Sequence, residues 1–409
     1  MNERTVAFLR QNGFAVDEID CEALIAAFDH EIEQALGGGK SSLQMLPSSL
    51  KADGRVVTDT PTLVVDAGGT NLRVGAVTIP SDGSAPRFEH IVRLPMPGTT
   101  GRVCADAFHG TIAAALDSVA AKVPRADRLG YCFSYACEST ANHDAKLLAW
   151  SKQVEAPEVV GQFVGAELVR RLARPVRRVA VLNDTVATLL AGKATCPSAG
   201  GASFLGFILG TGTNTAAVEK GEIRNAESGE FDKVVRSAFD LAFDETTSDP
   251  GCAVFEKMIS GAYLGPLGRE MLRFAARAGL FSSATAVALE SCRTLETREL
   301  DDFAAGGVPD FAAGFDTADI GPVRELAQAV FRRAAVLTAV HLAAFVRRQP
   351  TERVVLTVDG STYYKTRSVP FDTLVRGELA ALVPHHTFEI VRVDEAPMVG
   401  AAIAALTDD

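Results

Sequence analysis

The 409-residue sequence has few cysteines, and their arrangement does not suggest a structural role. The seven cysteines are odd in number, scattered along the chain, and include no Cys-x-x-Cys pair. Disulfide frameworks and zinc sites usually require paired, closely spaced cysteines. We therefore expect reduced thiols in a cytoplasmic protein.

Positive charge is scarce as well. The chain has 40 Lys and Arg residues against 51 Asp and Glu residues, which gives a formal net charge of −11. Nucleic acids and anionic membranes are bound through clustered basic residues. The composition therefore argues against both as main partners. Any phosphate site must be local, built from backbone N–H groups and a metal ion.

The sequence also lacks a long hydrophobic run. Residues 1–13 carry charged and polar side chains where a signal peptide has an apolar segment. The most apolar stretch, residues 334–346, contains His341 and is shorter than the roughly 20 residues that a membrane span needs. We predict a buried helix there. With 47% hydrophobic and 22% charged residues, a chain of this length should form two globular domains.

Two glycine-rich turns are the most informative motifs present. The first is DAGGTN at residues 66–71, the second is GTGTN at residues 210–214, and each lies between two apolar runs typical of β-strands. Glycine allows backbone N–H groups to approach phosphate oxygens. One such turn could be an ordinary tight hairpin. Two turns with the same pattern indicate two related half-structures that hold one polyphosphate in a cleft.

The remaining patterns indicate strands and helices in alternation. Helical spacing over residues 6–36 stops at three glycines, residues 37–39. Further expected helices cover residues 105–123, 159–172, 186–192, much of 253–348, and 398–406, and expected strands cover residues 129–133, 178–182, 354–358 and 387–393. Strand pairs followed by helices occur twice, which predicts two α/β lobes with a cleft between them.

Asp184 is the candidate catalytic base. It follows the buried strand 178–182 and precedes a helix, so its carboxylate should project into the cleft and could accept a proton from an attacking hydroxyl. An Asp in the sequence Asn-Asp-Thr is also a common helix cap. The two roles can coexist.

Seven segments, taken together, resemble the hexokinase family of the actin–Hsp70–sugar kinase superfamily, and they occur in the family's order along nearly the whole chain. The nucleotide segments are DAGGTNLRV (66–74), LNDTVAT (182–188), LGTGTN (209–214) and VDGSTY (358–363). The segments similar to family sequence around the sugar are LGYCFSY (129–135), WSK (150–152) and PGCAVFEKMISG (250–261).

This resemblance implies an α/β protein with the two-lobed actin-like ATPase (ribonuclease H-like) fold and an active-site cleft between a small and a large domain. The small domain would comprise residues 57–184 and 395–409, and the large domain residues 1–56 and 185–394. The implied reaction is ATP-dependent phosphorylation of a hexose, most readily glucose, at its 6-hydroxyl. The implied cofactors are ATP and Mg²⁺.

The resemblance also assigns roles to individual residues. Asp184 would be the base, and Lys152 would neutralise charge near the transferred phosphate. Asp66 would hold Mg²⁺ through water. The hexose would contact Ser134, Ser151, Lys152, Asn183, Asp184, Asn214, Glu227 and Glu256. The nucleotide would contact Asp66, Gly68, Gly69, Thr70, Asn71, Arg73, Gly210, Thr211, Gly212, Asp359, Gly360 and Ser361.

Some positions depart from the family pattern. Ala136 stands where proline is common, Ala187 where glycine is usual, and SKQV (151–154) replaces Thr-Lys-Gly-Phe. The Ala136 and Gln153 changes affect the sugar loop, and so the preferred hexose.

Two other functions are compatible with the same fold. A hexose-binding sensor without turnover would be free to lose Asp184 and the phosphate turns. A non-sugar ATPase would leave Ser134, Lys152, Glu227 and Glu256 without a role. Oligomeric state is not indicated by the sequence.

Overall fold

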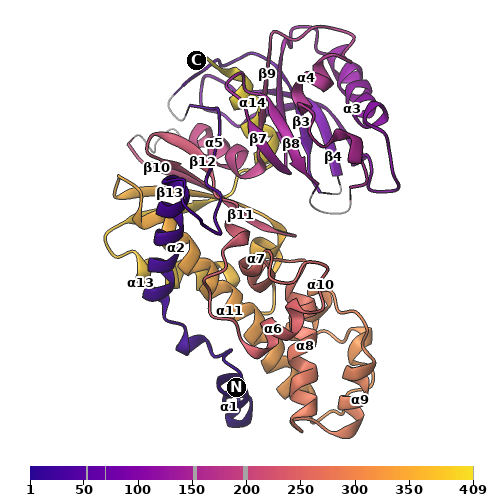
Figure 1. Ribbon diagram of the computed structural model, residues 1–409, viewed down its shortest axis with the longest axis vertical. Helices are drawn as coiled ribbons and strands as arrows, with labels where there is room; N and C mark the ends of the chain where they lie inside the picture. Colours follow the sequence, from indigo (N-terminus) through magenta and orange to yellow (C-terminus); the bar gives the residue numbers. More distant parts are fainter. Residues whose placement is uncertain (52–53, 70, 151–153, 197–200, 409) are drawn as a thin grey trace.

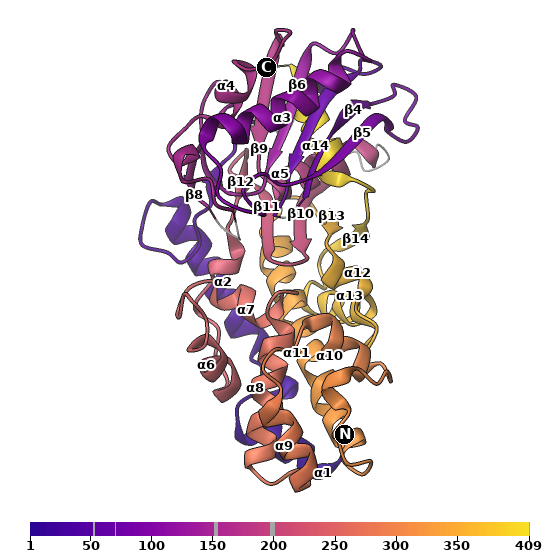
Figure 2. The same cartoon turned by 90° about the vertical axis from the view of Figure 1, so that its right-hand side faces the viewer.

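The computed structural model describes residues 1–409 except 52–53, 70, 151–153, 197–200 and 409. The molecule is elongated. A lobe built around one β-sheet lies at one end, a second sheet lies near the middle, and a group of helices forms the other end (Figures 1 and 2).

The first sheet has the strand order β5-β4-β3-β6-β9. β3, β4 and β5 pair antiparallel in sequence order, while β6 and β9 continue the sheet parallel to β3. The strands are β3 Thr62–Ala67, β4 Asn71–Thr78, β5 Arg87–Pro95, β6 Arg128–Phe133 and β9 Arg178–Leu182. Every residue of β3 and β6 is buried. Their carboxyl ends therefore meet at one edge, where the first glycine-rich turn lies.

The second sheet repeats this topology with one additional edge strand. Its order is β1-β12-β11-β10-β13-β14, with β10, β11 and β12 antiparallel and β13 and β14 parallel to β10. The strands are β1 Leu46–Pro47, β10 Ser203–Leu209, β11 Thr213–Glu219, β12 Glu222–Asn225, β13 Arg353–Asp359 and β14 Thr387–Val391. The second glycine-rich turn joins β10 to β11, as the first joins β3 to β4. This repeat confirms the predicted two-lobed α/β fold.

Two helices pack between the two sheets. α5 (Asp184–Thr195) contacts β10 and β13, and α14 (Ala396–Leu406) contacts α5 as well as β3 and β6. Where the helices cross, a Cβ on Gly400 would lie 1.9 Å from the carbonyl oxygen of Ala187, so this approach requires glycine. The contact is with the backbone of Ala187 and so does not depend on the side chain at that position.

Smaller elements complete the first lobe. They are the hairpin of β7 (Ala136–Ser139) and β8 (Ala145–Ala149), the strand pair β2 (Arg55–Val56) and β15 (Thr407–Asp408), the helices α3 (Ala105–Ala120) and α4 (Val164–Val169), and the short turn η2 (Pro157–Val159).

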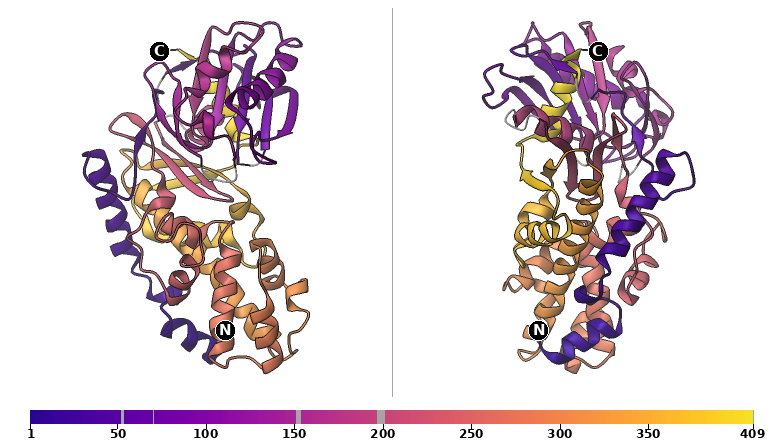
Figure 3. Two further views of the ribbon diagram at one scale, coloured as in Figure 1. Left: turned by 45° about the vertical axis from the view of Figure 1, so that its right-hand side comes forward. Right: turned by 90° about the vertical axis from the view of Figure 1, so that its left-hand side faces the viewer.

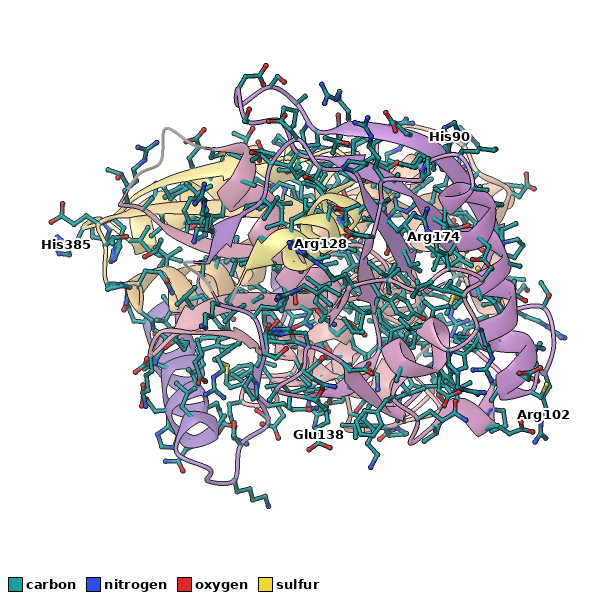
Figure 4. The ribbon with its side chains drawn as sticks, turned by 90° about the horizontal axis from the view of Figure 1, so that it is seen from above. His90, Arg102, Arg128, Glu138, Arg174 and His385 are labelled. Atoms are coloured by element: carbon teal, nitrogen blue, oxygen red, sulfur yellow. The ribbon has the colours of Figure 1, made fainter. Side chains whose placement is uncertain are left out.

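In the view from above (Figure 4), Arg128 lies centrally beside α14, whereas His90, Arg102 and His385 lie at the rim. Arg128 donates through Nη1 to the carbonyl oxygen of Ala405 at 3.1 Å, which joins β6 to the end of α14.

The remaining helices build the other end of the molecule, with α2 running along its side (Figure 3). They are α1 Glu3–Gln11, α2 Cys21–Leu36, α6 Ala238–Asp244, α7 Val254–Ile259, α8 Leu264–Arg277, α9 Ser283–Ser291, α10 Thr297–Ala304, α11 Ile320–Arg347, α12 Ser361–Lys365 and α13 Phe371–Leu382, with the short turns η1 Val16–Glu18, η4 Ser228–Glu230 and η5 Asp310–Ala312.

Helix α11 confirms the buried helix predicted for residues 334–346. Among the described helices it alone is long and apolar enough to cross a membrane, yet 94% of its most apolar window is buried inside the protein. Two other helix predictions are less accurate. Residues 6–36 form two helices because the chain turns at Gly13, which has a φ of 70°. The helix predicted for residues 159–172 is shorter: α4 covers residues 164–169, and the short turn η2 covers residues 157–159.

Candidate active site

The first glycine-rich turn has a hydrogen bond within its own backbone and another to the predicted sugar segment. Gly68 donates its N–H to the carbonyl oxygen of Asn71 at 3.1 Å. The Tyr135 hydroxyl donates to the carbonyl oxygen of Gly68 at 2.7 Å. The predicted sugar segment therefore touches the predicted phosphate turn directly.

Asp66 lies at the end of β3, only 3% exposed, directly opposite Arg73 of β4. Arg73 donates through Nε to Asp66 Oδ2 at 2.6 Å, and its guanidinium also pairs with Glu395. Arg93 donates to the other oxygen of Glu395 at 3.0 Å. Glu395 immediately precedes α14, so Arg73, expected to bind the nucleotide, ties the first turn to that helix in this structure. Glu395 was not predicted from the sequence.

Asp184 is the first residue of α5, and its neighbour Asn183 is the cap. Asn183 Oδ1 accepts hydrogen bonds from the N–H and the hydroxyl of Thr185 at 2.9 and 2.6 Å. The capping role considered for Asp184 therefore belongs to Asn183. Asp184 is half-buried, and no described residue donates a hydrogen bond to its carboxylate.

The Asp184 carboxylate influences groups from both halves of the molecule. Burial raises the pKa of Asp66 despite its pairing with Arg73, and Asp184 raises it further. Burial likewise raises the pKa of Glu227 to about 7, with Asp184 again contributing. The pKa of Asp359 is raised mainly by burial and also by Asp184. Asp184 thus lies where the metal, sugar and nucleotide residues predicted from the sequence converge.

The arrangement of Asp66 and Asp184 fits a magnesium ion. Their mutual repulsion is relieved by a cation, and Mg²⁺ typically uses one or two carboxylates together with waters and nucleotide phosphates. Within the described ranges, no group of three or more His, Cys, Asp or Glu side chains forms a self-sufficient metal cage. The expected role of Asp66 is thus to hold Mg²⁺ through water beside the nucleotide phosphates.

The second glycine-rich turn is fixed from outside by the segment after α7 and by α12. Gly261 and Thr362 both donate to the carbonyl oxygen of Gly210 at 2.8 Å, and Ala262 donates to the carbonyl oxygen of Thr211 at 3.0 Å. Asp359 pairs in register with Ile208 of β10, and its Oδ1 accepts from the Gly360 N–H at 2.8 Å. The predicted adenosine segment, residues 359–361, therefore lies beside this turn.

Asn214 and Asn225 form the centre of a buried polar network. Asn214 Nδ2 donates to Asn225 Oδ1 at 2.7 Å, and Asn214 Oδ1 accepts from the N–H groups of Thr215 and Ser228. Asn225 Nδ2 donates to Glu227 Oε1 at 2.7 Å. Asn214, expected to contact the sugar, thus also positions Asn225, which orients Glu227. Asn225 was missed because a single Asn at the end of a strand has no distinctive sequence signal.

Charged residues on a helix are usually exposed, but Glu256 and Lys257 are part of the interior. Glu256 is half-buried, and its Oε2 accepts from the Thr213 N–H at 2.7 Å. Lys257 is 3% exposed, and its Nζ donates to Asp244 Oδ1 at 2.7 Å, to the Thr247 hydroxyl at 3.0 Å and to the carbonyl oxygen of Asp249 at 2.9 Å. The lysine therefore holds the loop that precedes α7, the helix that carries Glu256.

The remaining predicted sugar residues are only partly described. Ser134 is buried at the end of β6, and its N–H donates to the carbonyl oxygen of Ala67 at 3.2 Å. Thr70, Ser151 and Lys152, together with Gln153, lie outside the described residues. A pocket with about 410 Å³ of empty space, partly open to solvent, adjoins the site at Asn183 and Asn225. It does not include Asp184 or either phosphate turn.

Known proteins resemble this chain over nearly all of its length. Residues 9–194 and 204–407 match two family models, both described as hexokinase. Hexokinase-1 of Schizosaccharomyces pombe is 29% identical over 74% of this chain and 69% of the relative. A hexokinase of Schistosoma mansoni is 31% identical over 79% of each chain. The solved structure of a Schistosoma mansoni hexokinase complexed with glucose has a TM-score of 0.80 at 26% identity and covers 98% of both chains.

Proposed function

This chain belongs to the hexokinase family and is an ATP-dependent hexose kinase, and we propose that its cleft phosphorylates the 6-hydroxyl of glucose or a related hexose. The observation that carries the proposal is the position of Asp184. Its carboxylate, without a hydrogen-bond donor among the described residues, lies at the start of α5, close to Asp66 and Glu227. There it would accept the hydroxyl proton as that oxygen attacks the γ-phosphate.

The groups around Asp184 divide the remaining work. Glu227 and Glu256, with Ser134 and Asn183, would bind the sugar hydroxyls. A site whose buried groups hydrogen-bond hydroxyls rejects analogues that lack them. The N–H groups of the two glycine-rich turns would hold the phosphates. Asp66 would hold Mg²⁺ through water, and the ion, when bound, would neutralise charge on the phosphates.

Lys152 and Ser151 are retained in the proposal on family resemblance. Ala136 and Gln153 flank the sugar residues and are proposed to tune the choice of hexose. We also propose a cytoplasmic location, which the seven free cysteines support because reduced thiols persist there.

The proposed function is tested by measuring ADP release with and without glucose, mannose, fructose and glucosamine. We expect hexose-stimulated release with the phosphate on the 6-oxygen of the product, identified by NMR. Release that is independent of sugar would indicate a non-sugar ATPase. Sugar binding without release would indicate a sensor. Either result would overturn the proposal.

Hexose binding should weaken as the pH falls from 8 to 6. The pKa of Glu227 is about 7 because the side chain is buried near other carboxylates, and sugar hydroxyls donate to the ionised form. Binding therefore releases a proton near neutral pH. If a group with this pKa must be ionised for the hexose to bind, the hexose affinity falls about tenfold between pH 8 and pH 6. Calorimetry at both pH values measures this change.

The matched variant for this prediction is Glu227→Gln, which has no proton to lose. It should bind hexose more weakly but with an affinity that hardly changes over the same pH range. Equal pH dependence in the variant and the wild type would show that another group titrates.

A further inference from the structure

A carboxylate occupies one of the backbone donors of the second phosphate turn. Glu256 Oε2 accepts the Thr213 N–H at 2.7 Å, a distance typical of a charge-assisted hydrogen bond. The fit depends on glycine, because a Cβ on Gly212 would lie 2.5 Å from the same oxygen. The missing side chain at Gly212 thus makes room for Glu256.

Neighbouring segments hold the carbonyl groups of this turn. Those of Gly210 and Thr211 accept bonds from Gly261, Thr362 and Ala262. In the described part of the chain, the N–H groups of Thr211 and Gly212 have no acceptor. Of these three successive N–H groups, only that of Thr213 has an acceptor among the described residues, and that acceptor is an anionic oxygen.

The Glu256 carboxylate also adds negative charge where phosphate would have to bind. The charges of Glu230 and Glu256 each raise the pKa of Glu227. Burial, followed by the charge of Glu256, raises the pKa of Tyr263 to about 12. A second anion entering this region is repelled unless the carboxylate moves or its charge is offset by hydrogen-bond donors. The Tyr263 hydroxyl already hydrogen-bonds to Glu256, and hexose hydroxyls would add further donors.

We propose that Glu256 gates the second phosphate turn. Without hexose, its carboxylate occupies the Thr213 N–H and disfavours nucleotide phosphates at the turn. When a hexose hydroxyl donates to Glu256, the carboxylate turns toward the sugar and the Thr213 N–H becomes available to phosphate. This inference rests on the proposed function. It adds a direct link from sugar to nucleotide that restrains ATP hydrolysis in the absence of sugar.

The gate predicts a change in nucleotide binding that can be measured without turnover. In the wild type, ADP and a non-hydrolysable ATP analogue should bind about tenfold more weakly without glucose than at saturating glucose, within the usual range of coupling between sites. In Glu256→Ala, binding without glucose should strengthen to near the glucose-saturated wild-type value. Isothermal titration with Mg²⁺ present measures each affinity.

Glu230→Gln is the matched control, because it removes a carboxylate charge from the same region, while its Oε2 accepts the Ala253 N–H at 3.0 Å and not the Thr213 N–H. It should leave sugar-free nucleotide affinity close to that of the wild type. Glu256→Gln, which keeps an acceptor but loses the charge, should fall between wild type and Glu256→Ala. Its circular dichroism and thermal midpoint verify folding if the alanine variant is unstable.

Unchanged sugar-free nucleotide affinity in folded Glu256→Ala or Glu256→Gln would overturn the gate, as would an equal gain in Glu230→Gln. Failure of the proposed function itself would look different, because the wild-type protein would then release no ADP in response to any hexose.

Discussion

Asp184→Asn should lower kcat for hexose phosphorylation by a factor of about 10² to 10⁴, which is the usual contribution of a positioned general base. The amide has the shape of the carboxylate but cannot accept the proton of the attacking hydroxyl. Hexose and nucleotide should still bind, because the turns and Glu227 remain in place. A coupled assay of ADP release gives kcat, and titration gives the two affinities.

The structure separates this loss from unfolding. Asn183, not Asp184, caps α5, and none of the described residues donates a hydrogen bond to the Asp184 side chain. Its replacement therefore removes no described internal bond, and the thermal midpoint should stay near that of the wild type. Retention of kcat within about tenfold, in a folded variant, would assign the proton to another group.

Arg333→Met should reduce the free energy of unfolding by about 3–5 kcal/mol, because it leaves a buried carboxylate without its partner. Arg333 of α11 donates two hydrogen bonds, at 2.9 and 2.8 Å, to the two oxygens of Asp240 in α6. Both side chains are 4% exposed. The guanidinium also lies over the ring of Phe14, 4.3 Å from its centroid, so it links α11, α6 and the segment after α1. Urea denaturation followed by circular dichroism measures the loss.

Arg277→Met provides the control for this stability prediction. Arg277 pairs with Glu290, but the two side chains are 60% and 43% exposed, and such pairs contribute about 1 kcal/mol or less. The double variant Arg333→Met with Asp240→Asn should recover part of the stability, because the remaining amide is uncharged. Equal losses in Arg333→Met and Arg277→Met would contradict the buried-pair interpretation.

The local features of the site were predictable. The two hairpin turns, strand β9 and the end of α2 at Gly37 occur where the sequence predicted them. Each is encoded within a few neighbouring residues, by alternation of apolar side chains or by glycine. The boundaries of the two domains and the individual roles of the site residues stay predictions.

The environments of charged residues were not predictable in the same way. Lysines on helices are usually exposed, but Lys257 is buried by contacts with Asp244 and with the loop that follows Asp244. Arg73 pairs with Glu395, which lies 322 positions away in the sequence. Whether such a group is solvated, paired or buried depends on which distant segment packs against it.

The sequence by itself determined where the two matching glycine-rich turns lie and that Asp184 lies between them in the chain, because short local patterns encode turns and strand ends. Only the tertiary structure decided what surrounds those groups. In the folded protein, Asn225 donates a hydrogen bond to Glu227, Arg73 pairs with Glu395, and Glu256 accepts the Thr213 N–H of the second turn. Those contacts join residues that are brought together only when the two sheets and the helices between them pack, and they set which donors and charges are available to the substrates.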